Sequence, residues 1–204
     1  MTVFAPTIAL KSSLWDNLAR IAIGHAREAR THRATWEAGV LRDIQPEMHA
    51  SMVAVTAVSF AIDAIHAEIA PLVSRDPDPR TGRGRQWGYM LETFRRASPA
   101  ARTWQTDLEW VYALRDDAVH FHGEAHEPVW HPGLKTNIAR ENLAYSVESS
   151  ERAVDFLVAT LSAILLPDPQ RPPELAAWGQ ARAHVLVELD ALRSSIQHRS
   201  TEGE

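Results

Sequence analysis

The chain has 204 residues, of which 45% are hydrophobic and 23% are charged, a composition ordinary for a globular protein. This length predicts a single domain over residues 1–204 that is large enough to bury a core without crosslinks. The absence of cysteine excludes disulfides and thiolate metal sites. The formal net charge of -5 excludes a generally basic surface for nucleic acid.

The first ten residues lack a basic region and a long apolar run, so they do not predict a secretory signal. The most apolar segment, residues 51–73, contains polar groups that would be costly in lipid. We therefore expect this segment to be a buried core helix instead of a membrane span. The sequence predicts a cytoplasmic protein with no membrane partner.

The hydrophobic pattern is helical nearly throughout and shows no sustained two-residue alternation, so no sheet is expected. The expected helices cover about residues 12–38, 46–73, 86–97, 99–121, 136–166 and 174–196. Pro46 fits the first turn of its helix, and Ser98 followed by Pro99 is a strong helix start. Together these segments predict an all-α, up-and-down bundle of about five to six helices, with its core over residues 12–196.

Three segments interrupt or follow the helical pattern. Residues 75–85 combine proline, glycine and arginine, which predicts a loop. Its arginines are able to contact phosphates, although a solvated loop is the commoner outcome. Residues 123–133 predict an irregular crossing with two prolines, and residues 198–204 predict a disordered tail.

The helix expected to end near residue 121 contains the sharpest chemical feature of the sequence. On a helical wheel Arg115 falls at the centre of an apolar stripe formed by Trp104, Leu108, Val111, Ala118 and Val119. A buried arginine needs a carboxylate or another polar partner. Asp116 and His120 are spaced to share a neighbouring face, whereas His120 lies about 140° from Arg115 on this wheel. The plain alternative is that Arg115 is an ion-pair hub and His120 a helix cap.

The apolar helix over residues 46–73 offers a partner for this arginine. Its polar residues at helical spacing form one stripe: Thr56, Ser59, Asp63 and His66. A polar stripe inside a bundle needs polar company, so we predict that Asp63 pairs with Arg115. The alternative is that the stripe faces solvent.

The segment Leu-Arg-Asp-Asp-Ala-Val-His-Phe at residues 114–121 resembles the signature of the HEPN domain family. That signature is an arginine, usually followed by a polar residue, and a histidine after four to six further positions late in a bundle helix. Four residues separate Arg115 from His120 here, and Asp116 fills the polar position. The organisation of residues 12–166 is also similar to that of a HEPN bundle.

This resemblance implies a metal-independent endoribonuclease of toxin or phage-defence type that needs no cofactor. Its composite site would form where two motif helices meet across a homodimer. Two helices could supply one site with both groups, although Arg115 and His120 point in different directions on a single helix. His120 would act as general acid or base, Arg115 would hold the scissile phosphate, and Asp116 would orient them. RNA and a cognate antitoxin or other protein are the implied partners. Some members are non-catalytic, so a helical binding or dimerisation protein is the alternative.

Two further hypotheses arise from the residues themselves. His120, His122, His126 and His131 are dense, but their spacing matches no zinc pattern, and we predict no metal site. Seven tryptophans provide anchors for a scaffold without chemistry. The sequence has no phosphate-binding glycine loop, no nucleophile elbow and no His-Glu-x-x-His motif, so it does not support a nucleotide kinase, a serine hydrolase or a zinc protease.

Overall fold

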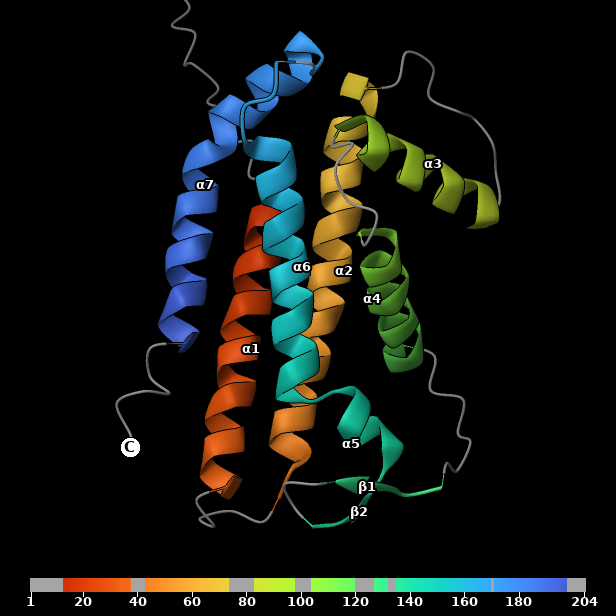
Figure 1. Ribbon diagram of the computed structural model, residues 1–204, viewed down its shortest axis with the longest axis vertical. Helices are drawn as coiled ribbons and strands as arrows, with labels where there is room; N and C mark the ends of the chain where they lie inside the picture. Colours follow the sequence, from red (N-terminus) through yellow and green to blue (C-terminus); the bar gives the residue numbers. More distant parts are fainter. Residues whose placement is uncertain are drawn as a thin grey trace, which may run out of the picture.

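The computed structural model describes residues 13–37, 43–73, 83–97, 104–119, 127–131, 135–169 and 171–197. Over these residues the chain is an all-α bundle with one small pair of strands (Figure 1), which confirms the predicted fold class. The helices are α1 Leu14–Glu37, α2 Gln45–Val73, α3 Arg83–Ala97, α4 Trp104–Val119, α5 Arg140–Ala144, α6 Val147–Leu165 and α7 Pro173–Gln197. The long helices α1, α2, α6 and α7 run side by side, and α4 lies beside α2 (Figure 1).

Helix α2 lies at the centre of the bundle and contacts α1, α3, α4 and α6. Small residues such as Ala54 and Ala61 on α2, and Ala22 and Ala26 on α1, are buried and allow the two helices to approach closely. Within the described residues α2 is the one helix long and apolar enough to cross a membrane. Its packing against other helices of the same chain accounts for that composition, as expected of a core helix.

A buried carboxylate joins α1, α2 and α6 at one end of the bundle. Glu47 is 4% exposed and accepts hydrogen bonds from Arg33, from the Trp36 indole at 2.7 Å and from the backbone N–H of Val147 at 2.9 Å. Arg33 also pairs with Glu148 on α6 at 2.7 Å. The buried charge is therefore fully paired, as burial of a carboxylate requires.

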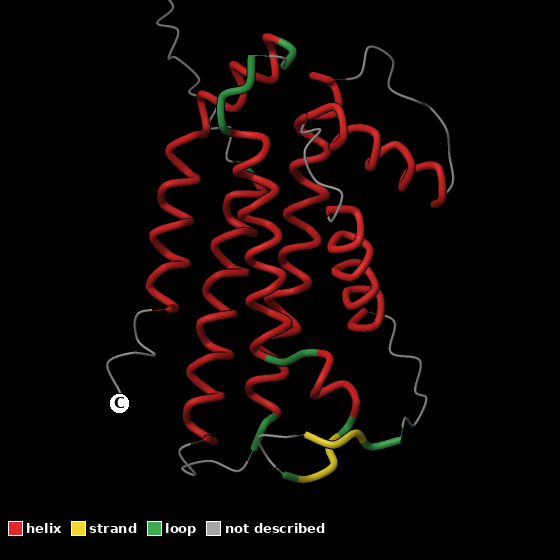
Figure 2. Tube along the Cα trace, viewed as in Figure 1, coloured by secondary structure: helices red, strands yellow, loops and turns green. Residues whose placement is uncertain are grey.

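The segment after α4 departs from the prediction. The expectation of no sheet is wrong, because β1 Val129–His131 pairs antiparallel with β2 Thr136–Ile138 (Figure 2), with Trp130 opposite Asn137. Each strand has only three residues, too few to show an alternating pattern. Lys135 precedes β2 with a φ of 53°, a left-handed turn conformation.

The single helix expected from about residue 136 is likewise wrong. Residues Thr136–Ile138 are a strand, and the helical part is divided into α5 and α6. Tyr145 and Ser146 separate the two helices, and Ser146 accepts the Ser149 backbone N–H as the N-cap of α6. A capping hydroxyl in the middle of a helical pattern competes with helix continuation, which explains the break.

The other boundaries agree with the prediction to within a few residues. Helix α3 begins at Arg83, so the expectation of a loop is wrong at residues 83–85, and the rest of that expected loop, residues 75–82, lies outside the described residues. The start expected at Ser98 and Pro99, the helix end at 120–121 and the tail at 198–204 lie outside the described residues.

Candidate functional site

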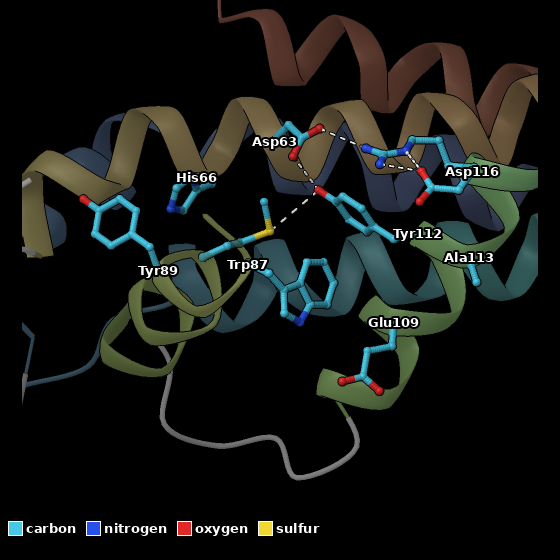
Figure 3. A pocket seen from close by; sticks show the side chains of 10 residues that line it. Asp63, His66, Trp87, Tyr89, Glu109, Tyr112, Ala113 and Asp116 are labelled. Atoms are coloured by element: carbon cyan, nitrogen blue, oxygen red, sulfur yellow. Dashed lines mark hydrogen bonds and ion pairs between the residues drawn. The ribbon is translucent and has the colours of Figure 1, made fainter. Parts of the chain in front are cut away.

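A pocket of about 860 Å³ opens between α2, α3 and α4 beside the motif helix (Figure 3). Two side chains come from α2, three from α3 and five from α4. They are Asp63, His66, Trp87, Tyr89, Met90, Glu109, Tyr112, Ala113, Arg115 and Asp116. The pocket therefore contains two of the three predicted catalytic residues and two of the three predicted supporting residues.

The Arg115 side chain is held at one end of this pocket and is 18% exposed. Its Nε and one Nη donate to the same oxygen of Asp116, at 3.1 and 2.7 Å. Its other Nη lies 3.6 Å from a carboxylate oxygen of Asp63 on α2. The predicted pairing of Asp63 with Arg115 is therefore confirmed, at ion-pair distance.

Tyr112 completes this network. Its hydroxyl donates to the second oxygen of Asp63 at 2.5 Å, and its ring lies under the Arg115 guanidinium, 4.5 Å from the ring centroid (Figure 3). Burial and the hydrogen bond to Asp63 raise the pKa of Tyr112 well above its ordinary value. The phenol is thus a permanent donor, and one carboxylate orients both the phenol and the arginine.

His66 lines the other end of the pocket, between the aromatic rings of α3. Its ring lies edge-on to Tyr89 with centroids 5.2 Å apart, and Phe94 is 6.3 Å away. Burial lowers the pKa of His66, an effect that the nearby Asp63 only partly opposes, so the imidazole is neutral near pH 7. Its Nε2 is buried and has no hydrogen-bond partner among the residues that the structure describes.

Ser59 and His120 are the predicted site residues that remain. Ser59 is fully buried, and its hydroxyl donates to the Thr56 carbonyl of its own helix at 2.8 Å instead of entering the pocket. His120 follows the end of α4 and lies outside the described residues, as do His122 and His126. His131 is described in its backbone alone, in β1.

Sequence reasoning missed the aromatic wall of the pocket. Trp87 packs edge-to-face on Tyr112 with centroids 5.1 Å apart, and Tyr89 and Met90 extend the same wall. Tyr112 precedes Arg115 by three positions and therefore shares its helix face, so its place beside Arg115 could have been predicted from the spacing. For Trp87 no comparable signal exists, because its place depends on how α3 packs.

The pocket is acidic apart from its arginine. Asp63, Glu109 and Asp116 face the single cation Arg115 among the lining residues. Within the described part of the chain, no three histidine, aspartate or glutamate side chains are grouped so that they could hold a metal ion. The described geometry offers hydrogen bonding and charge from Arg115, Asp63, Asp116 and Tyr112, together with aromatic surface.

Comparison of the chain with protein-family models, with curated proteins and with solved structures gives no match.

Proposed function

We propose that the protein is a HEPN-like, metal-independent endoribonuclease whose composite site forms between two copies of the chain. The observation that carries the proposal is the placement of Arg115. Asp63 and Asp116 hold its guanidinium at the end of an open pocket, five positions before His120 in the sequence. A preorganised cation and a general acid–base together supply what metal-independent cleavage of a phosphodiester uses.

In the proposed reaction, His120 of one copy takes the proton from a ribose 2′-hydroxyl, and that oxygen attacks the adjacent phosphorus. The bond from phosphorus to the 5′-oxygen breaks, a water molecule protonates that leaving oxygen, and the imidazolium then returns its proton to the solvent. The products are a 2′,3′-cyclic phosphate and a free 5′-hydroxyl. Arg115 would stabilise the charge that develops on the phosphate oxygens.

Arg115 retains donors for this task. A guanidinium carries five N–H donors, and the hydrogen bonds to Asp116 engage only one on Nε and one on an Nη, while the other Nη lies 3.6 Å from Asp63 as an ion pair. The same contacts fix the orientation of the guanidinium and therefore the direction of its remaining N–H groups. Asp116 and Asp63 would therefore act as positioning residues for the arginine, and Tyr112 would support Asp63.

The proposed activity is tested with the purified full chain and mixed RNA in the presence of EDTA. Wild-type protein is expected to cleave RNA, and Arg115→Ala and His120→Ala are each expected to reduce the rate at least about 100-fold. Arg96→Ala, which removes an exposed arginine paired with Glu92 on α3, is the matched control and is expected to retain the rate. Cleavage that EDTA abolishes, or that survives both motif substitutions, contradicts the proposal.

The composite site is tested by mixing the two inactive variants. If Arg115 of one copy works with His120 of the other, heterodimers of Arg115→Ala and His120→Ala regain one intact site, and part of the activity returns. A mixture that stays inactive although heterodimers form would place arginine and histidine in the same copy, against the composite arrangement.

A second candidate function is a non-catalytic binding or dimerisation protein. The acidic lining of the pocket favours it, because Asp63, Glu109 and Asp116 weaken the attraction of Arg115 for an anionic phosphate. A wild-type protein that leaves all RNA intact, while forming a stable complex with itself or another protein, would support this second function.

A further inference from the structure

The pocket is much larger than a phosphate at Arg115 would need. Its volume of about 860 Å³ lies within the range of about 300–1,000 Å³ that is usual for small-molecule sites. The space beyond Arg115 is bounded mainly by rings and a thioether from α3, namely Trp87, Tyr89 and Met90. The walls therefore suit a flat, largely apolar group attached to whatever Arg115 holds.

The indole of Trp87 is the main flat surface in this space. Its edge-to-face contact with Tyr112 fixes the orientation of the indole, and the side chain is only half-buried. In the view of Figure 3 it lies between the Tyr112 ring and the Glu109 carboxylate. Unpaired RNA bases stack on aromatic side chains of this kind, and such stacking tolerates any base.

Two kinds of polar group would then select among bases. The buried Nε2 of His66 is a neutral hydrogen-bonding atom that lacks a partner among the described residues. A neutral ring nitrogen suits the edge of a heterocycle better than it suits an ion. The His66 ring lines the pocket, whereas Nε2 itself is shielded from solvent, so contact with a bound group requires the imidazole to turn.

Carboxylates are the second kind of polar group in the pocket. Glu109 is exposed at the pocket and accepts from Gln105 through one oxygen, at 2.8 Å. A carboxylate accepts hydrogen bonds only, so it favours a base edge with adjacent donors. The edge of guanine presents an imino and an amino group side by side, whereas that of uracil places one imino group between two carbonyl oxygens. Acidic lining thus favours guanine and disfavours uracil.

We propose that the pocket between α2, α3 and α4 binds a guanine base of single-stranded RNA. Trp87 provides the stacking surface, Glu109 contacts the base edge, and His66 joins it once its imidazole turns toward the base. The inference rests on the proposed ribonuclease function, because it assigns to Arg115 the phosphate attached to that nucleotide. It adds a base preference that the Arg-x4-His motif alone does not contain.

Binding of mononucleosides tests the pocket without any cleavage step. The full chain is titrated with guanosine and with uridine, followed by calorimetry, and guanosine is expected to bind at least about tenfold more tightly. Trp87→Leu is expected to weaken guanosine binding by about tenfold, and Glu109→Gln is expected to narrow the preference over uridine. Trp130→Leu, at an exposed tryptophan in β1, is the control and should leave both affinities unchanged.

Two further measurements separate this proposal from the ribonuclease function. Guanosine has no phosphate, so Arg115→Ala is expected to weaken binding of guanosine 3′-monophosphate far more than binding of guanosine. Guanosine binding by a protein that never cleaves RNA supports the pocket and contradicts the nuclease, whereas cleavage without any nucleoside binding does the reverse. Trp87→Phe keeps an aromatic ring and should retain much of the guanosine affinity. It therefore distinguishes loss of the stacking surface from misfolding.

Equal affinities for guanosine and uridine, or insensitivity of binding to both Trp87 substitutions in folded protein, would overturn the proposal. So would binding of spermidine, a polyamine, in place of any nucleoside. That result would assign the acidic and aromatic lining to an organic cation.

Discussion

Asp63 on α2 uses its two oxygens for two different residues of α4. One accepts the Tyr112 hydroxyl at 2.5 Å, and the other lies 3.6 Å from an Nη of Arg115. The Tyr112 ring in turn lies beneath the same guanidinium. Three side chains from two helices thereby fix one another, so the position of Arg115 depends on a residue distant in sequence.

This arrangement predicts how substitutions at Asp63 affect stability. Asp63→Asn keeps an acceptor for the Tyr112 hydroxyl and removes the charge, so we expect a loss of about 1 kcal/mol or less in the free energy of unfolding. Asp63→Ala leaves the largely buried phenol without this acceptor and should cost about 1–3 kcal/mol. Urea unfolding measures both. Asp190→Asn, in an exposed pair with Arg193, is the control, and equal costs for the two Asp63 variants would contradict the prediction.

Glu47 is expected to be the most sensitive charged residue of the bundle. Glu47→Gln leaves Arg33 with a weaker acceptor in a buried setting, and we expect a loss of about 3 kcal/mol in the free energy of unfolding. Asp107→Asn, whose partner Arg152 is exposed, should cost under about 1 kcal/mol. Chemical denaturation distinguishes the two. A Glu47 variant as stable as the control would show that the buried network is not required for the fold.

Tyr145 predicts a coupling between the α5–α6 junction and the motif helix. Its hydroxyl donates to the Leu114 carbonyl at 2.6 Å, and burial chiefly raises the pKa of Tyr145 to about 12. Tyr145→Phe removes this bond and should cost about 1–2 kcal/mol in the free energy of unfolding. Because Leu114 adjoins Arg115, the same variant is expected to reduce any ribonuclease rate more than Trp130→Phe does. An unchanged stability would contradict the prediction.

The helices were predictable from sequence because the spacing of apolar residues along a long helix does not depend on how that helix packs. The pairing of Asp63 with Arg115 was predictable for a related reason, since a polar stripe and a central arginine each needed a buried partner. The strands at 129–131 and 136–138 were not, because three-residue strands are specified by a turn and by mutual pairing. The break at Ser146 depends on one capping side chain, which the spacing of apolar residues does not reveal.

The site was predictable only in its charged part. A helical wheel cannot distinguish an aromatic ring in the core, such as that of Phe94, from one on the wall of a pocket, such as that of Tyr112 or Trp87. That distinction arises from the oblique packing of α3 beside α2 and α4, which Figure 1 shows. The orientation of His66 toward Tyr89 and Phe94 follows from the same packing.

Glu148 gives a prediction on acid sensitivity. Burial opposes its ionisation, but the hydrogen bonds and charge of Arg33, a backbone N–H and the Ser146 hydroxyl together outweigh this effect and hold the pKa of Glu148 at about 2, below its ordinary 4.5. The folded state therefore binds fewer protons than the unfolded state in this range. The contribution to stability is fully present above pH 4.5 and is lost as the pH falls toward 2. Since the Glu148 side chain is largely exposed, that contribution should be about 1 kcal/mol or less.

The measurement compares wild type with Glu148→Gln by urea unfolding at pH 7, 4.5 and 3. The variant lacks the titrating group, so the stability difference between the two proteins should be constant from pH 7 to just above 4.5 and should shrink at pH 3. Glu92→Gln removes a carboxylate from an exposed pair with Arg96 and controls for the loss of a surface charge. Stability curves of wild type and Glu148→Gln that run parallel down to pH 3 would show that Arg33 does not hold Glu148 in the folded state.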